Sequence, residues 1–108
     1  MRVMFLTFLA SASVLAGCVS SEERAPFYDR ELFAYVRCNH NNSVALASRS
    51  SDPYALAITA EASCGREERT LLIAMERRNG PGFALSEMDG FQQRAIQRNV
   101  ATIVKRRA

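Results

Sequence analysis

The four residues SSDP, Ser50 to Pro53, decide the fold of this chain because they predict a turn followed directly by a helix. Asp52 is a favoured N-cap residue, since its carboxylate can accept hydrogen bonds from the free backbone N–H groups of the first turn. Pro53 suits the first helical position, where its missing N–H is not needed. Apolar residues recur at helical spacing on both sides of the turn, which predicts a hairpin of two antiparallel helices.

Before the turn, the hydrophobic pattern predicts one helix over about residues 28–49. Its larger apolar members are Leu32, Phe33, Tyr35, Val36, Val44 and Leu46. The run Asn39-His40-Asn41-Asn42 has poor helix propensity and is the weak part of this helix. Two interpretations remain open for the asparagines: a kink at which their side chains bond to the backbone, which we prefer, or a polar recognition surface.

After the turn, residues 53–78 predict a second helix, with Gly65 as its weak interior point. The sequence Asn79-Gly80-Pro81-Gly82 ends it. A third helix is expected to start after Ser86, with Asp89 completing a variant of the capping box. Its apolar stripe comprises Met88, Phe91, Ala95, Ile96, Val100, Ile103 and Val104. The expected fold is therefore all-α, a hairpin plus a third helix forming a small three-helix bundle.

Two cysteines, Cys38 and Cys64, lie at equal distances along the chain from Ser51. On antiparallel helices they would both lie roughly 20 Å from the turn. Residues at equal distances before and after Ser51 should then face each other across the two helices, for example Asn42 and Ala60. A disulfide needs Cα atoms about 4.4–6.8 Å apart, and alanines on the cysteine faces permit that approach. We predict a Cys38–Cys64 disulfide that staples the hairpin.

A redox-active pair and a metal site are the alternatives for these cysteines. Redox pairs usually lie two residues apart in the sequence, and a zinc site needs more ligands than two cysteines and His40. The sequence therefore predicts no metal site.

The N-terminus begins with Met1-Arg2 and continues with the apolar run Val3 to Leu15. As a helix this run would span roughly 20 Å, which is short of the roughly 30 Å hydrocarbon core and indicates a cleaved signal. Its ending, Leu15-Ala16-Gly17-Cys18, resembles the lipobox of bacterial lipoproteins. The resemblance implies cleavage before Cys18, diacylglycerol on the thiol and an N-acyl chain such as palmitate on the freed amine. The alternative is an ordinary secretory signal with an accidental cysteine.

The lipobox resemblance implies three parts: a signal peptide over 1–17, a lipidated cysteine and tether over 18–26, and a periplasmic helical domain over 27–108. Two or three acyl chains anchor a protein firmly to a membrane. Val19 is not the aspartate that marks inner-membrane retention in many lipoproteins, so the periplasmic face of the outer membrane is the expected location. That compartment is oxidising and permits the disulfide.

The formal net charge of +3 is too small for a polycation that binds nucleic acid. Basic residues do gather on one side of the third helix and in its tail: Arg94, Arg98, Lys105, Arg106 and Arg107. They are either a solvated polar face or a surface that contacts anionic lipid or peptidoglycan.

Titratable candidates for catalysis are His40 and the carboxylates Glu61, Glu67 and Glu68, with Arg69 beside them. They form no recognisable nucleophile–base–acid set, so we expect an exposed histidine and a solvated acidic face, with no catalytic residues, small-molecule substrate or non-covalent cofactor. Two functions remain. The first is an accessory, pilot-like lipoprotein that binds part of a larger envelope protein through an apolar groove. The second is an envelope-surface binder that acts through the basic third helix.

Overall fold

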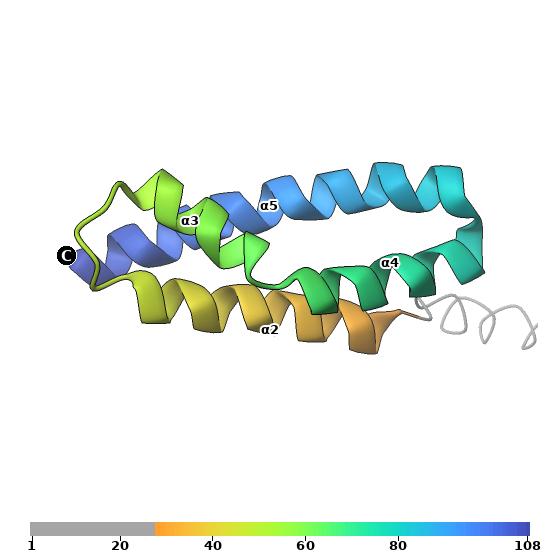
Figure 1. The fold of residues 1–108 in the computed structure, drawn as a ribbon, viewed down its shortest axis with the longest axis horizontal. Coiled ribbons are helices and arrows are strands. Elements are labelled where there is room, and N and C mark those ends of the chain that lie inside the picture. The colour runs from red at the N-terminus through yellow and green to blue at the C-terminus, as the bar shows by residue number, and fades with distance from the viewer. Residues whose placement is uncertain (1–27) are drawn as a thin grey trace, which may run out of the picture.

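The computed structural model describes residues 28–108, which form four helices. They are α2 (Asp29–Leu46), α3 (Pro53–Ala62), α4 (Gly65–Asn79) and α5 (Pro81–Arg107). In Figure 1, α2 runs in one direction, α3 and α4 follow one another back along it, and α5 returns beside all three. The predicted all-α fold is confirmed as a three-helix bundle in which the second of the three helices is broken into α3 and α4. We call α3 and α4 together the middle leg of the bundle. The expected signal peptide and lipidated cysteine lie outside the described residues.

Helix α2 is continuous through the asparagine run, as predicted, although it ends at Leu46 rather than at Arg49. Inside it, Asn39 Nδ2 donates to the backbone oxygen of Tyr35 at 3.1 Å. One turn further on, Ser43 Oγ donates to the backbone oxygen of Asn39 at 2.8 Å. These polar side chains bond to the backbone of their own helix without interrupting it.

The SSDP turn forms as the sequence predicts. One carboxylate oxygen of Asp52 accepts hydrogen bonds from the backbone N–H groups of Tyr54 and Ala55, at 3.0 and 3.1 Å. Pro53 occupies the first position of α3. The N-cap therefore satisfies two of the donors that a helix start leaves without a partner in the helix.

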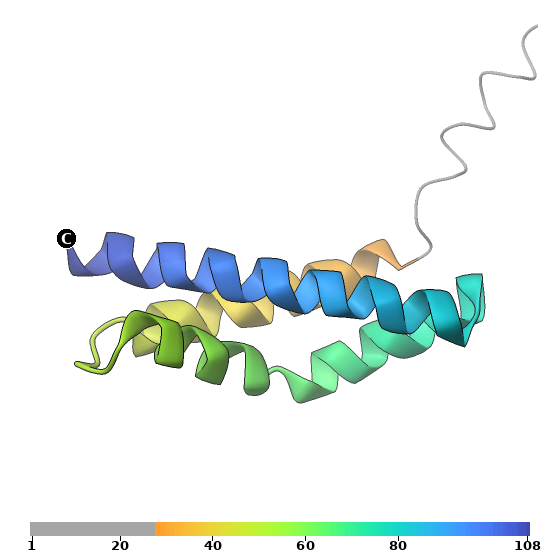
Figure 2. The same ribbon diagram turned by 90° about the horizontal axis from the view of Figure 1, so that it is seen from above.

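The prediction of one unbroken helix over 53–78 is wrong, because Ser63 and Cys64 separate α3 from α4. The backbone N–H of Cys64 bonds to the carbonyl of Glu61, three residues back, which tightens the last turn of α3. Gly65 follows at once and adds the entropic cost of a glycine. The two helices differ in direction at this junction, which Figure 2 shows from above.

The third helix also starts earlier than expected, at Pro81 rather than after Ser86. Gly80 has φ +90°, a left-handed conformation that favours glycine, and its N–H bonds to the carbonyl of Glu76 at 2.9 Å. Pro81 then occupies the first turn of α5, where proline is well tolerated. A single glycine therefore ends α4 and begins α5, and Ser86 and Asp89 lie inside the helix.

The core consists of two groups of buried side chains. One lies around Tyr35, Cys64, Leu71, Met75, Ala84, Met88 and Ala95, and the other around Ala47, Leu56, Ala57 and Ile103. Many of these residues are small, so the helices can approach one another closely. Within residues 28–108, no helix combines the length and the hydropathy needed to cross a bilayer.

Candidate functional site

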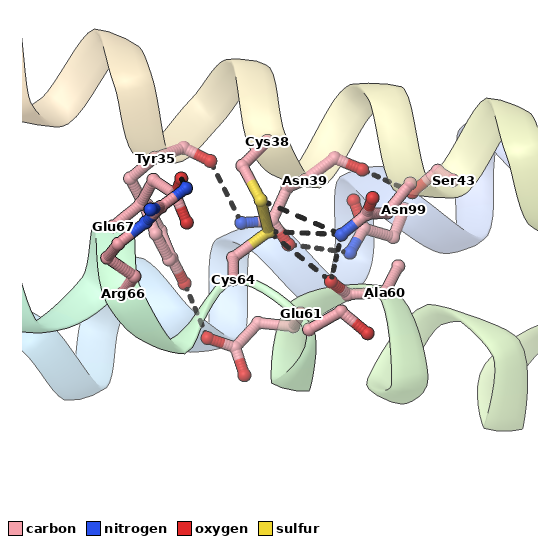
Figure 3. Close-up of a disulfide and its surroundings, with 12 residues drawn as sticks. Tyr35, Cys38, Asn39, Ser43, Ala60, Glu61, Cys64, Arg66, Glu67 and Asn99 are labelled. Atoms are coloured by element: carbon pink, nitrogen blue, oxygen red, sulfur yellow. Dashed lines mark hydrogen bonds and ion pairs between the residues drawn. A yellow bond between two sulfur atoms is a disulfide. The ribbon is translucent and has the colours of Figure 1, made fainter.

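The predicted disulfide is present between Cys38 of α2 and Cys64 at the junction of α3 and α4 (Figure 3). The sulfur atoms are 2.06 Å apart and the Cα atoms 6.0 Å apart. The predicted register is also confirmed, since Asn42 Nδ2 donates to the backbone oxygen of Ala60 at 3.1 Å. The same amide nitrogen lies 3.3 Å from the sulfur of Cys64. The disulfide and this amide together fix α2 against the middle leg.

Cys38, Cys64 and Glu67 have ligand atoms within 4.8 Å of one another, and within residues 28–108 they are the group whose spacing would suit a metal ion. Because the two sulfurs are bonded to each other, neither can act as a thiolate ligand. His40 is exposed and does not belong to this group. The arrangement is that of a structural disulfide.

A buried polar network crosses the bundle beside the disulfide (Figure 3). Asn99 of α5 is 2% exposed, and its Nδ2 donates to Asn39 Oδ1 at 2.9 Å and to the backbone oxygen of Ala57 at 3.1 Å. These bonds connect α2, α3 and α5. Asn39 and Asn42 therefore point into the bundle, where their amides bond to backbone oxygens, as the preferred interpretation of the asparagine run expects.

Tyr35 and Glu61 form a second polar contact, in which the tyrosine hydroxyl donates to Glu61 Oε2 at 2.9 Å. Burial raises the pKa of the Tyr35 hydroxyl, and the bond to Glu61 raises it further. Burial also raises the pKa of the Glu61 carboxyl, and the neighbouring Glu68 carboxylate adds to this effect. The bond from Tyr35 acts in the opposite direction on Glu61, because it stabilises the charged carboxylate.

The raised pKa of Glu61 predicts a pH-dependent stability. The folded chain binds this proton more tightly than the unfolded chain, so the free energy of unfolding should fall as the pH rises from the ordinary carboxyl value of 4.5 through the folded pKa. Glu61→Gln should remove this part of the decrease. Tyr35→Phe should raise the pKa of Glu61 further, because it removes the donor to the carboxylate. Urea unfolding at several pH values and carboxyl carbon NMR titration check these results. A Glu61 pKa at or below 4.5 in the parent protein would contradict the assignment.

A groove of about 400 Å³ lies between α2 and α5. Its apolar lining includes Leu32, Val36, Phe91 and Ala95. Asn39 and Asn99 lie at its buried base, while His40, Arg94 and Arg98 are exposed at its rim. Binding sites are commonly concave, mostly apolar and provided with a few polar groups, and the groove has these properties.

The charge at the rim of the groove is positive. Arg94 and Arg98 line it, and no carboxylate side chain does. The guanidinium carbon of Arg94 lies 5.0 Å from the centre of the Phe91 ring, a cation–π contact that restricts this side chain. The groove therefore combines a mostly apolar lining with two cations one helical turn apart.

The structure separates the five basic residues that the sequence grouped together. Arg94 and Arg98 lie at the groove, while Lys105 and Arg106 are exposed near the end of α5. Arg107 has a different environment. Its guanidinium donates to the backbone oxygens of Ala47, Arg49 and Ser51.

The bonds of Arg107 satisfy carbonyl groups at the end of α2 and in the turn that follows it. We therefore assign Arg107 to the fold rather than to a binding surface. The sequence gives only a weak signal for this role of Arg107, because the role depends on how the end of α5 packs against the end of α2.

The fold and the groove define a class, a small all-α bundle that is held by a disulfide and carries an apolar groove with a basic rim. Comparison of the chain with protein-family models, with curated proteins and with solved structures finds no match.

Proposed function

We propose that this protein is a lipid-anchored accessory protein of the bacterial cell envelope that binds a segment of a larger envelope protein between α2 and α5. The anchor rests on the lipobox that ends at Cys18, and the proposed location is the periplasmic face of the outer membrane. The observation that carries the binding role is the open apolar groove, because a groove of this kind can take a segment of another chain.

The position of the anchor suits this role. The proposed tether precedes Tyr28 in the sequence, and α2 begins at one end of the bundle (Figure 1). Residues 19–26 can reach at most about 26 Å, and the groove begins at Leu32, one helical turn into α2. A protein held in this way keeps its groove near the membrane, within reach of membrane-bound partners.

The surroundings of His40 and Glu61 support a binding role over acid–base catalysis by this pair. His40 lies at the rim of the groove, whereas Glu61 bonds to Tyr35 and is not among the residues that line the groove. General acid–base catalysis needs its groups within hydrogen-bond reach of one reacting centre. Glu61 therefore does not lie in the groove that His40 borders.

Binding to peptidoglycan or anionic lipid through the basic third helix is the second candidate. It is favoured by the exposure of Arg94, Arg98, Lys105 and Arg106 along α5. However, α5 is about 40 Å long, and its basic end lies opposite the end of the bundle at which α2 begins (Figure 1). The groove therefore supports the accessory role better. Salt-sensitive sedimentation with peptidoglycan or anionic vesicles, lost when the basic residues are neutralised, would favour the second candidate instead.

Photocrosslinking in the native membrane tests the proposal. A benzoylphenylalanine in place of Val36 lies in the groove, and one in place of Tyr54, which is 59% exposed on α3, serves as the control. We expect a discrete protein adduct from the groove position and none from the control. Mass spectrometry of the same product should find an N-terminal peptide that begins at an acylated Cys18. An unlipidated product that retains residues 1–17 would contradict the anchor, and equal labelling from both positions would contradict the groove.

A further inference from the structure

We propose that the groove binds an acidic amphipathic helix of the partner protein. This inference rests on the proposed function and specifies the chemistry of the bound segment. It follows from the dimensions of the groove, the state of the polar groups at its base and the charge at its rim.

The groove has the length of a short helix. It extends from Leu32 to His40 along α2 and from Phe91 to Thr102 along α5. At the rise of an α-helix these stretches are about 12 and 16 Å long, which corresponds to two or three helical turns. A partner helix that lies along them would present apolar side chains at positions i, i+3 or i+4, and i+7 to the apolar lining.

Most of the amide protons at the base of the groove are already used within the bundle, which leaves the apolar lining as the larger contact surface. Asn99 Nδ2 donates to Asn39 Oδ1 and to the backbone oxygen of Ala57, so both of its protons are used. Asn39 Nδ2 donates to the backbone of its own helix. A ligand group that replaced these bonds would have to compensate for them, whereas an apolar side chain leaves them intact.

The rim of the groove favours carboxylates. Arg94 and Arg98 lie four residues apart, so they are neighbours on one face of α5, and both are exposed. Two acidic residues one turn apart on the partner helix match this spacing, and each guanidinium can bind a carboxylate through two parallel bonds. The Phe91 ring holds the Arg94 guanidinium beside the groove before the partner arrives.

Selection from a display library of random 16-residue peptides against the full chain in zwitterionic nanodiscs tests this proposal. We expect the enriched peptides to be acidic, to have apolar residues at helical spacing and to show helical circular dichroism when bound. Arg94→Glu with Arg98→Glu should weaken the binding of the best peptide about tenfold, since two attractive pairs become repulsive. Arg69→Glu with Arg77→Glu on α4 makes the same change in net charge and should leave the affinity within twofold. Circular dichroism of all variants checks that they fold.

Several outcomes would overturn the acidic helix. The selection would do so if it enriched basic or extended peptides, or no peptides at all. The variants would do so if the charge reversal at the groove left the affinity unchanged. Competition would do so if palmitate or anionic vesicles displaced the bound peptide and their own binding depended on Arg94 and Arg98 in the same way. The crosslinking experiment separates this failure from that of the proposed function. A crosslinked partner whose contact segment is basic or extended contradicts the acidic helix only. The absence of any adduct from Val36 contradicts the accessory role itself.

Discussion

Replacing both cysteines, Cys38→Ala together with Cys64→Ala, should lower the free energy of unfolding by about 3.5 kcal/mol. The disulfide closes a loop of 26 residues, and in the loop-entropy model it restricts the unfolded chain by that amount. For a domain of this size the loss corresponds to a decrease of roughly 15–25 °C in the melting temperature. Urea and thermal unfolding of the parent protein and the double variant measure the effect. A small domain has few other sources of stability, so the loss is a large fraction of the total.

Reduction gives an independent measurement of the same quantity. Dithiothreitol should destabilise the parent protein by a similar amount and should leave the double variant unchanged. Alkylation of the non-reduced protein should leave Cys38 and Cys64 unmodified. If both thiols react freely before reduction, or if the reductant has no effect on the parent, the structural disulfide is contradicted.

The hairpin and its disulfide could be predicted because they depend on local chemistry and on counting. Asp52 and Pro53 define a helix start through their own side chains, whatever the rest of the chain does. Once the turn is placed, the rise of the helix fixes which residues face each other. This is why the contact between Asn42 and Ala60 could be expected from the sequence.

The break in the middle leg could not be predicted in the same way. Gly65 was recognised as a weak point, but a glycine inside a helix costs only about 1 kcal/mol and is often tolerated. Whether the chain breaks there depends on tertiary contacts, here the burial of Cys64 in the core and its bond to Cys38. The start of α5 differs from the prediction for a related reason, because Gly80 and Pro81 both end one helix and start the next, and the sequence pattern alone indicates only the end.

The groove could not be predicted from the sequence, because its shape depends on the register between α2 and α5. The residues that form it are about 60 positions apart along the chain, as the bond between Asn39 and Asn99 illustrates. Their alignment depends on the length of the middle leg and on both connections. Arg94 and Arg98 were identified as exposed cations on one face of a helix, but the apolar residues beside them come from another helix. The sequence therefore predicted the charge of the site and not its shape.

The Asn39–Asn99 pair should behave as a single unit when it is mutated. Asn99→Leu alone is expected to cost about 2–3 kcal/mol, because it leaves Asn39 Oδ1 without its donor in the buried interior. Asn39→Leu alone should have a similar cost, since it removes the acceptor that Asn99 uses. With both residues replaced by leucine, no member of the pair is left unsatisfied, and the stability should return to within about 1 kcal/mol of the parent. Asn41→Leu, at an exposed position of the same helix, is the control and should change the stability by less than about 0.5 kcal/mol.

Urea unfolding of the parent, the two single variants and the double variant forms a double-mutant cycle that measures this coupling. Simple additivity of the two single effects would show that the amides act separately and would contradict the pair. The double variant also tests what the polar contact contributes besides stability. Two amides that must meet align α5 with α2 at one register, whereas two leucines can pack in several. We therefore expect one set of amide peaks in the nitrogen–proton NMR spectrum of the parent and additional sets in the double variant.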